Sequence, residues 1–263
     1  MAWARSLPFG TYGGPLVARD DPEPAAVRAL LARGVAARLV EVRVAGGEIV
    51  HAPDDQALDP AWREIASAAT AGDTHGLGLE RPHEELVAGL HRETRRGLRH
   101  AEKSGVTADV DAAALPAAYA LYRAQAGAWR GHRLFEPAFL EALLAHGPGF
   151  ARLHVARRGS ELLCAILALS GGGETFAWWS GASPAARALL AYPFLMLDIA
   201  RCAAEAGDRR FNLGGSGGRE NLHAFKESLG AVPRRVWIYH LAPRRADWRL
   251  KLVAWARVLR RRP

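Results

Sequence analysis

The chain has 263 residues, 49% apolar and 24% charged, which is the composition of a folded soluble protein and excludes a disordered or fibrous one. Its formal net charge of +8 favours a polyanionic partner: nucleic acid, a phosphorylated substrate or an anionic membrane surface. No apolar run approaches the roughly 20 residues of a membrane span, and the first residues lack a signal-peptide core, so a cytoplasmic location is expected.

The two cysteines carry no sign of a disulfide or a metal site. Cys164 falls in an apolar, strand-like run, and Cys202 falls in an amphipathic, helix-like run. Neither has a cysteine or histidine at metal-ligand spacing near it in the sequence. Buried free thiols in a reducing compartment are therefore expected, and no metal is predicted.

The first part of the chain has weak patterns. Gly13-Gly14-Pro15, after Tyr12, is typical of a tight turn. Pro24 opens a predicted helix over 25–32 that Gly34 closes, because proline is tolerated at a helix start and glycine favours its end. The expected elements that follow are a strand over 37–44, a polar loop over 52–59 and a strand over 74–80.

A strongly basic helix is predicted over 83–104. Its apolar side carries Leu86, Leu90 and Leu98. Its other side carries arginines spaced three and four residues apart, which share one helical face: Arg92, Arg95, Arg96 and Arg99. The helix is either a solvated connection or a phosphate-binding face. The second interpretation is preferred because only Glu93 and Glu102 offset the charge.

A better-defined module follows Gly105 and mixes helices with strands. The predicted order is strand 106–110, helix 112–128, helix 137–145, strands 151–156, 161–169 and 174–180, helix 189–206, strand 211–213, helix 220–229 and strand 234–241. Beyond it, 244–262 places Trp248, Leu252, Trp255 and Leu259 on one stripe among arginines. That stripe packs on the core or, alternatively, forms a helix on a membrane surface.

The glycine-rich stretch 211–230 (FNLGGSGGRENLHAFKESLG) is the strongest candidate for a site. A short strand runs into five small residues, Gly214 to Gly218, and a helix starts after them. Backbone N–H groups and the positive end of the helix dipole then meet at one place, which favours an anion. Only three of the 35 Lys and Arg residues are lysines, and Lys226 lies in this helix. It is either a solvated helix residue or a cation kept for function.

Four segments carry a resemblance to a known family. They are LPFGTYGGPL (7–16), HRETRRGLRHAEKSGV (91–106), WWSGASPAARALL (178–190) and FNLGGS with HAFKESLGA (211–231). They resemble the FemAB-like aminoacyltransferases of the GNAT superfamily, which build peptidoglycan cross-bridges, and relatives in exopolysaccharide gene clusters. The resemblance implies an α/β (α+β) fold: a GNAT-like mixed sheet flanked by helices, in two GNAT-like halves with the N-terminal half incomplete.

The resemblance also implies a division of the chain. The expected parts are 1–82, a partial N-terminal half; 83–104, the basic connecting helix; 105–242, a complete acyltransferase domain; and 243–263, a basic amphipathic helix. The opening elements of the first half are missing, which indicates a late start codon or a reduced half. The family's Pro-Asn-Tyr is also replaced here by Ala191-Tyr192-Pro193, so no role passes to that asparagine.

Site roles follow from the same resemblance. Lys226 would neutralise a donor phosphate or charge at the carbonyl, and Phe225 would stack on the donor's terminal base, unless Phe225 is a core residue. The candidates for proton removal are Glu220 and His223, with Asp198 as a weaker option. The remaining donor candidates are Gly214, Gly215, Ser216 and Arg187. The acceptor or phosphate candidates are Arg95, Arg99, Trp179 and Tyr12.

Three functions remain open. The preferred one is a FemAB-type N-acyltransferase that moves an aminoacyl or acyl group to an amine on a cell-envelope or polysaccharide precursor, with a lipid-linked acceptor and peripheral membrane contact as options. Its donor would be charged tRNA, because 182–188 lacks the glycines with which CoA-dependent GNAT enzymes grip pyrophosphate. The alternatives are an acyl-CoA-dependent N-acetyltransferase acting on a small amine or amino sugar, and a non-catalytic polyanion- or membrane-binding module. No bound cofactor is expected.

Overall fold

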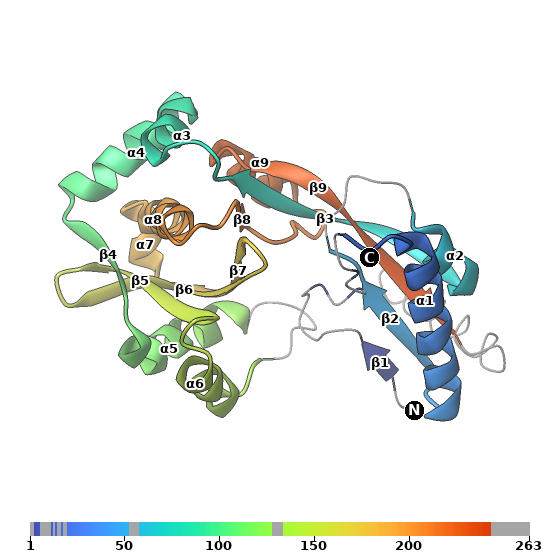
Figure 1. The fold of residues 1–263 in the computed structure, drawn as a ribbon. Helices are drawn as coiled ribbons and strands as arrows, with labels where there is room; N and C mark the ends of the chain where they lie inside the picture. Colours follow the sequence, from blue (N-terminus) through green and yellow to red (C-terminus); the bar gives the residue numbers. More distant parts are fainter. Residues whose placement is uncertain are drawn as a thin grey trace, which may run out of the picture. The chain divides into compact units, whose positions relative to one another are not determined.

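A computed structural model describes residues 3–242, except 6–11, 13, 15–16, 18–19, 53–57 and 128–133. The chain forms two compact units: unit 1 is Met1–Asp73 with Arg234–Pro263, and unit 2 is Thr74–Pro233 (Figure 1). The expected borders after residues 82 and 242 differ from these, because the first border lies within strand β3 (Ala68–Gly78). The basic helix belongs to unit 2 and is not a connection between parts.

Unit 1 is a small sheet with two helices. Its strands lie in the order β1 (Trp3–Arg5), β2 (Gly46–Val50), β9 (Val232–Leu241) and the first half of β3. β1 is parallel to β2, and β2 is antiparallel to β9. Helices α1 (Pro24–Glu41) and α2 (Pro60–Ile65) complete a core in which Trp62 and Tyr239 are fully buried.

The strand predicted over 37–44 is wrong, because α1 continues to Glu41 and passes through Gly34. Ala32, Val35 and Leu39 belong to the core of unit 1, at the i, i+3, i+7 spacing of one helical face. The apolar residues that suggested a strand over 37–44 therefore also fit one face of a helix. A Cβ at Gly34 would meet nothing within 4 Å, so this glycine lies on an open helix surface and does not end the helix.

Unit 2 is built on a mixed sheet in the order β3-β8-β7-β6-β5-β4. Its strands, besides the second half of β3, are β4 (Val106–Val110), β5 (Ala151–Arg158), β6 (Glu161–Gly171), β7 (Glu174–Ala182) and β8 (Arg210–Asn212). β4 to β7 are antiparallel neighbours, whereas β7 and β8 run parallel. The predicted α/β class, with a mixed sheet flanked by helices, is confirmed.

Helices cover both faces of this sheet (Figure 1). One face packs against α3 (His83–Gly89), α4 (Arg92–Lys103), α8 (Ala191–Glu205) and α9 (Glu220–Ser228). The other face packs against η1 (Ala112–Ala114), α5 (Leu115–Ala126) and α6 (Pro137–His146). The short helix α7 (Pro184–Ala188) joins β7 to α8.

Most elements predicted after Gly105 are confirmed, but two predicted helices, one of them before Gly105, are interrupted. The basic helix breaks at Leu90, which is buried and extended with ψ of 155°. The helix predicted over 189–206 begins at Ala191, because Leu190 adopts a left-handed backbone with φ of 53°. The helix predicted over 244–262 and most of the segment 7–16 lie outside the described residues.

Candidate functional site

The site begins where two parallel strands separate in unit 2. β7 and β8 pair over only three residues, the last pair being Phe176 with Asn212. β8 ends there, while β7 continues to Ala182 with no ladder partner on that side among the described strands. A β-bulge accompanies the separation, because Ala177 and Trp179 pair with neighbouring residues of β6 and leave Trp178 as the extra residue. Bulges bend a strand, which helps it to diverge from its neighbour.

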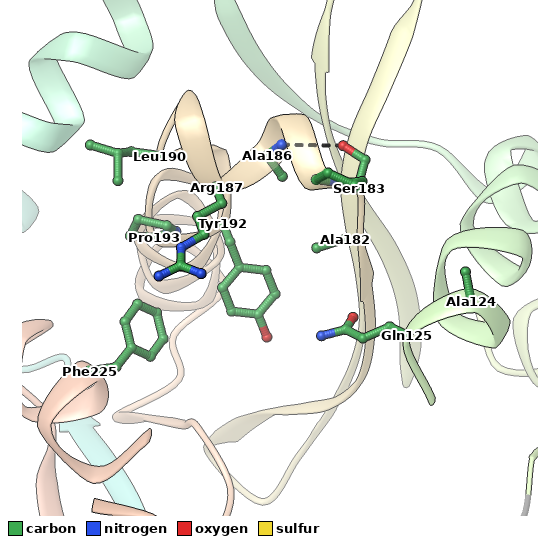
Figure 2. Close-up of a pocket in the computed structure, with 11 residues that line it drawn as sticks. Ala124, Gln125, Ala182, Ser183, Ala186, Arg187, Leu190, Tyr192, Pro193 and Phe225 are labelled. Carbon is green, nitrogen blue, oxygen red and sulfur yellow. Dashed lines mark hydrogen bonds between the residues drawn. The ribbon is translucent and has the colours of Figure 1, made fainter. Parts of the chain in front are cut away.

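A pocket of about 700 Å³ lies at the carboxyl end of β7. Eleven residues line it: Ala124, Gln125, Ala182, Ser183, Pro184, Ala186, Arg187, Leu190, Tyr192, Pro193 and Phe225. They come from α5, the end of β7, α7, the start of α8 and α9 (Figure 2). This volume is in the range of small-molecule and cofactor sites, and the lining is mainly apolar with few polar groups.

Two backbone features fix the walls of this pocket. Gly181 lets α5 lie directly on β7, since an added Cβ would be 2.5 Å from the Tyr122 nitrogen. That contact holds the end of α5, where Gln125 reaches the pocket. On the opposite wall, the Ser183 hydroxyl accepts a hydrogen bond from the Ala186 amide and caps α7.

Arg187 is the cation of the pocket. Its side chain is exposed, and it makes no hydrogen bond or ion pair with any residue that the structure describes. Figure 2 shows its guanidinium group turned towards the rings of Tyr192 and Phe225. An unpaired guanidinium beside apolar walls suits a ligand that carries an anionic group on an otherwise apolar or aromatic body.

Two aromatic rings connect α8 and α9 at this place. Tyr192 and Phe225 have ring centroids 6.0 Å apart. The Tyr192 hydroxyl lies 3.2 Å from Ser180 Oγ, and burial raises the pKa of Tyr192, so the phenol stays neutral at physiological pH. Phe225 is half-buried: it packs on the core and also lines the pocket, and its stacking on a donor base stays a prediction.

Lys226 is buried and holds the glycine-rich loop. Its side chain is 3% exposed, which rules out an ordinary solvated lysine. Nζ donates hydrogen bonds to the carbonyl oxygens of Gly214 at 2.7 Å and Gly215 at 2.8 Å. Gly214, Gly217 and Gly218 all have positive φ, which only glycine adopts easily. Lys226 does not line the pocket.

A chain of polar side chains lies beneath α9, also outside the pocket lining. His223 Nδ1 is 2.9 Å from His75 Nε2, and His223 Nε2 is 3.2 Å from Glu227. The other His75 nitrogen is 3.4 Å from the buried Ser216 hydroxyl. His223 was predicted from the sequence, whereas His75 was missed because it lies 148 residues earlier, on β3.

The other predicted site residues are dispersed. Glu220 and Arg99 are exposed, and Arg95 donates to the Ala88 carbonyl oxygen. Trp179 is 3% exposed and packs against Tyr122, with 4.9 Å between ring centroids. Tyr12 belongs to unit 1. The pocket therefore brings together Arg187 and Phe225 from the predicted set, and it adds Gln125 and Tyr192.

Comparison with known families identifies the fold. Residues 88–227, more than half of the chain, match the family described as an acetyltransferase (GNAT) domain. The chain belongs to the GNAT acetyltransferase family. The predicted membership of this superfamily is thus confirmed, and the family implies an acyl donor and an amine acceptor.

Solved structures similar to this GNAT chain share its fold at low identity. FemX superimposes with a TM-score of 0.68 at 14% identity, over 85% of this chain and 78% of that one. The C-terminal domain of a putative lysylphosphatidylglycerol synthetase from Agrobacterium fabrum gives 0.55 at 17% identity, over 79% and 72%. A protein of unknown function from Bacteroides thetaiotaomicron gives 0.60 at 9% identity, over 81% and 75%.

Two further searches give negative findings. No curated protein matches the sequence of this GNAT chain. Among the residues that the structure describes, none of the helices has the length and apolar content needed to span a membrane.

Proposed function

We propose that this GNAT chain is a FemAB-like N-acyltransferase that binds its acyl donor in the pocket of unit 2. The observation that carries the proposal is the unpaired Arg187 guanidinium beside the rings of Tyr192 and Phe225, where β7 and β8 have separated. The guanidinium takes a phosphate of the donor, Phe225 stacks on its base, and the acyl group reaches towards the open edge of β7.

Charged tRNA is the donor that the pocket wall favours. The position where CoA-dependent GNAT enzymes carry a glycine-rich loop is here the helix α7, preceded by Ser183 and begun by Pro184. Proline has no backbone N–H, and Ser183 already accepts from the Ala186 amide, so two groups that could grip a pyrophosphate are lost. A single guanidinium and an aromatic ring instead suit the phosphate and base of a nucleotide end.

The glycine-rich loop lies at the other end of the unpaired stretch of β7. A Cβ at Gly214 would be 3.5 Å from the Phe176 ring, which belongs to the last residue pair before the strands separate. Lys226 fixes the carbonyls of this loop, so it acts through the loop's shape and adds positive potential beside the transferred carbonyl. The paired His75 and His223 are the proposed path for the amine proton, because imidazole is the side chain best suited to proton transfer near neutral pH.

The acceptor is an amine on a cell-envelope or polysaccharide precursor. Similarity to FemX and to a lysylphosphatidylglycerol synthetase domain supports this class, including a lipid-linked acceptor at the inner face of the membrane. The second candidate is an acyl-CoA-dependent N-acetyltransferase acting on a small amine, which the description of the matched family as an acetyltransferase favours.

Binding of two small donor fragments separates these candidates. The probes are CoA and a CCA trinucleotide carrying an amide-linked aminoacyl group, both titrated into the full chain by calorimetry. We expect the trinucleotide to bind and Arg187→Ala to weaken its binding at least about tenfold, the usual loss when a charged hydrogen-bond partner is removed. Arg33→Ala is the matched control, because Arg33 is an exposed arginine on α1 in unit 1.

The outcomes are decisive for the donor. Binding of CoA alone, weakened by Arg187→Ala, would replace tRNA by acyl-CoA in the same pocket. Binding of neither probe, or binding of both that is unaffected by Arg187→Ala, would contradict the assignment of the pocket to the donor.

A further inference from the structure

A second cluster of chemically capable side chains lies in unit 2, between β5 and α8. It comprises His154, Asp198 and Cys202, and one candidate ligand atom from each lies within 4.8 Å of the other two. None of the three lines the pocket. The sequence hides this cluster, because His154 lies on a strand far from the two helical residues along the chain.

The secondary structure explains why the three side chains meet. Asp198 and Cys202 are four residues apart on α8, so they share one face of that helix. His154 lies in the middle of β5, and α8 packs on β5. Cys202 Sγ is 3.9 Å from Asp198 Oδ2.

His154 has a buried ring nitrogen that no described residue satisfies. Its side chain is 3% exposed, and its Nδ1 is buried with no hydrogen-bond partner among the described residues. Burying an unpaired imidazole nitrogen is unfavourable, so such a nitrogen normally has a partner.

We propose that His154, Asp198 and Cys202 form a binding site for a divalent transition metal of the Zn²⁺ class. Zinc takes nitrogen, oxygen and sulfur ligands at about 2.0 to 2.3 Å, so two atoms on one ion lie about 3 to 4 Å apart. The 3.9 Å separation of Sγ and Oδ2 meets this condition. This site goes beyond the proposed acyl transfer and does not depend on it.

The charges around the cluster are compatible with a cation. Arg201 donates to Asp198 Oδ1, which leaves Oδ2 for the metal. The same guanidinium lies 3.4 Å from Cys202 Sγ and is held by Glu205. Outer hydrogen bonds of this kind orient the ligating carboxylate. Arg152 is the other nearby cation, and it acts on both His154 and Cys202. Metal binding would release the proton of the Cys202 thiol, because the thiolate is the ligand.

The expected role is structural. The start of α8 forms part of the pocket wall, and the cluster lies two turns further along the same helix. A metal bound there would fasten α8 to β5. The metal would therefore stabilise the fold and take no part in the transfer step.

Cobalt substitution tests this site directly. The full chain, without a histidine tag, is treated with chelator and titrated with Co²⁺ while absorption is recorded. We expect a thiolate-to-cobalt charge-transfer band and strong tetrahedral visible bands that saturate at one equivalent and disappear with Zn²⁺. One equivalent of Zn²⁺ should also raise the melting temperature by several degrees.

Matched cysteine variants give the control. Cys202→Ala should abolish the charge-transfer band and weaken Zn²⁺ binding at least about tenfold, whereas Cys164→Ala, which removes the buried cysteine of β6, should retain both. Asp198→Asn and His154→Gln should each weaken Zn²⁺ binding to a similar degree. Absence of the bands, their survival in Cys202→Ala, or full affinity in both Asp198→Asn and His154→Gln would overturn the proposal.

Discussion

At the scale of single residues, Lys226 is a buried cation with a positioning task. It is almost fully buried, and its ammonium donates hydrogen bonds to two loop carbonyls. We expect Lys226→Met, which keeps the apolar stem but removes the charge and the donors, to lower the free energy of unfolding by at least about 2 kcal/mol. The measurement is urea denaturation followed by fluorescence.

Lys103→Met is the control for this prediction. Lys103 is exposed on α4, so the same substitution there should change stability by no more than about 0.5 kcal/mol. Equal effects of the two variants would show that the Lys226 ammonium contributes nothing to the loop.

Residue-scale contacts were the least predictable from the sequence. The glycine-rich turn and the singular lysine were visible, but the direction in which the ammonium points depends on the folded loop. The partner of His223 is a histidine on β3, and the residue that lies close to both Asp198 and Cys202 is a histidine on β5. Such pairs depend on strand order and register, which local patterns do not encode.

At the scale of elements, the close contact of α5 with β7 is what shapes the pocket. Gly181→Ala would place a methyl group 2.5 Å from the Tyr122 nitrogen, so α5 or β7 must move. We expect a loss of about 2 kcal/mol in stability and weaker donor binding, because Gln125 moves with α5. Urea denaturation and the donor titration measure the two effects.

Gly171→Ala is the matched control, since a Cβ at the end of β6 would meet nothing within 4 Å. If Gly181→Ala behaved like Gly171→Ala in both measurements, the contact between α5 and β7 would not constrain the pocket.

Helices and strands were predicted well where the apolar residues followed a single period, either that of a helix or that of a strand. β4 matches its predicted range, and the hairpin strands β5 to β7 match to within a few residues, because apolar runs there end at glycines. The predicted end of α1 was wrong because its apolar residues fit both the two-residue period of a strand and the 3.6-residue period of a helix. The predicted start of α8 was wrong because nothing in Leu-Leu-Ala-Tyr indicates that Leu190 adopts a left-handed backbone, with φ of 53°.

At the scale of the whole molecule, the two units are expected to lose structure separately. Tyr239 is fully buried in the core of unit 1, and its hydroxyl accepts a hydrogen bond from the Asp59 amide. Tyr239→Ala should lower the free energy of unfolding of that unit by about 3–5 kcal/mol. Hydrogen exchange should show faster exchange in α1 and β2, with unchanged protection in β5 to β7 of unit 2.

Val232→Ala, at an exposed position of the same strand, should leave both units protected. A uniform loss of protection in Tyr239→Ala would mean that the chain unfolds as one cooperative body.

Unit 1 is built from both ends of the chain, which constrains how the protein can fold during its synthesis. β9 lies between β2 and β3 in the sheet order, yet it is synthesised only after residues 79–231. At ordinary translation rates that delay is on the order of ten seconds, during which β2 and β3 exist without the strand that separates them. A nascent chain halted before β9 would therefore expose two unpaired strand edges, and it should be a preferred client of chaperones bound near the ribosome.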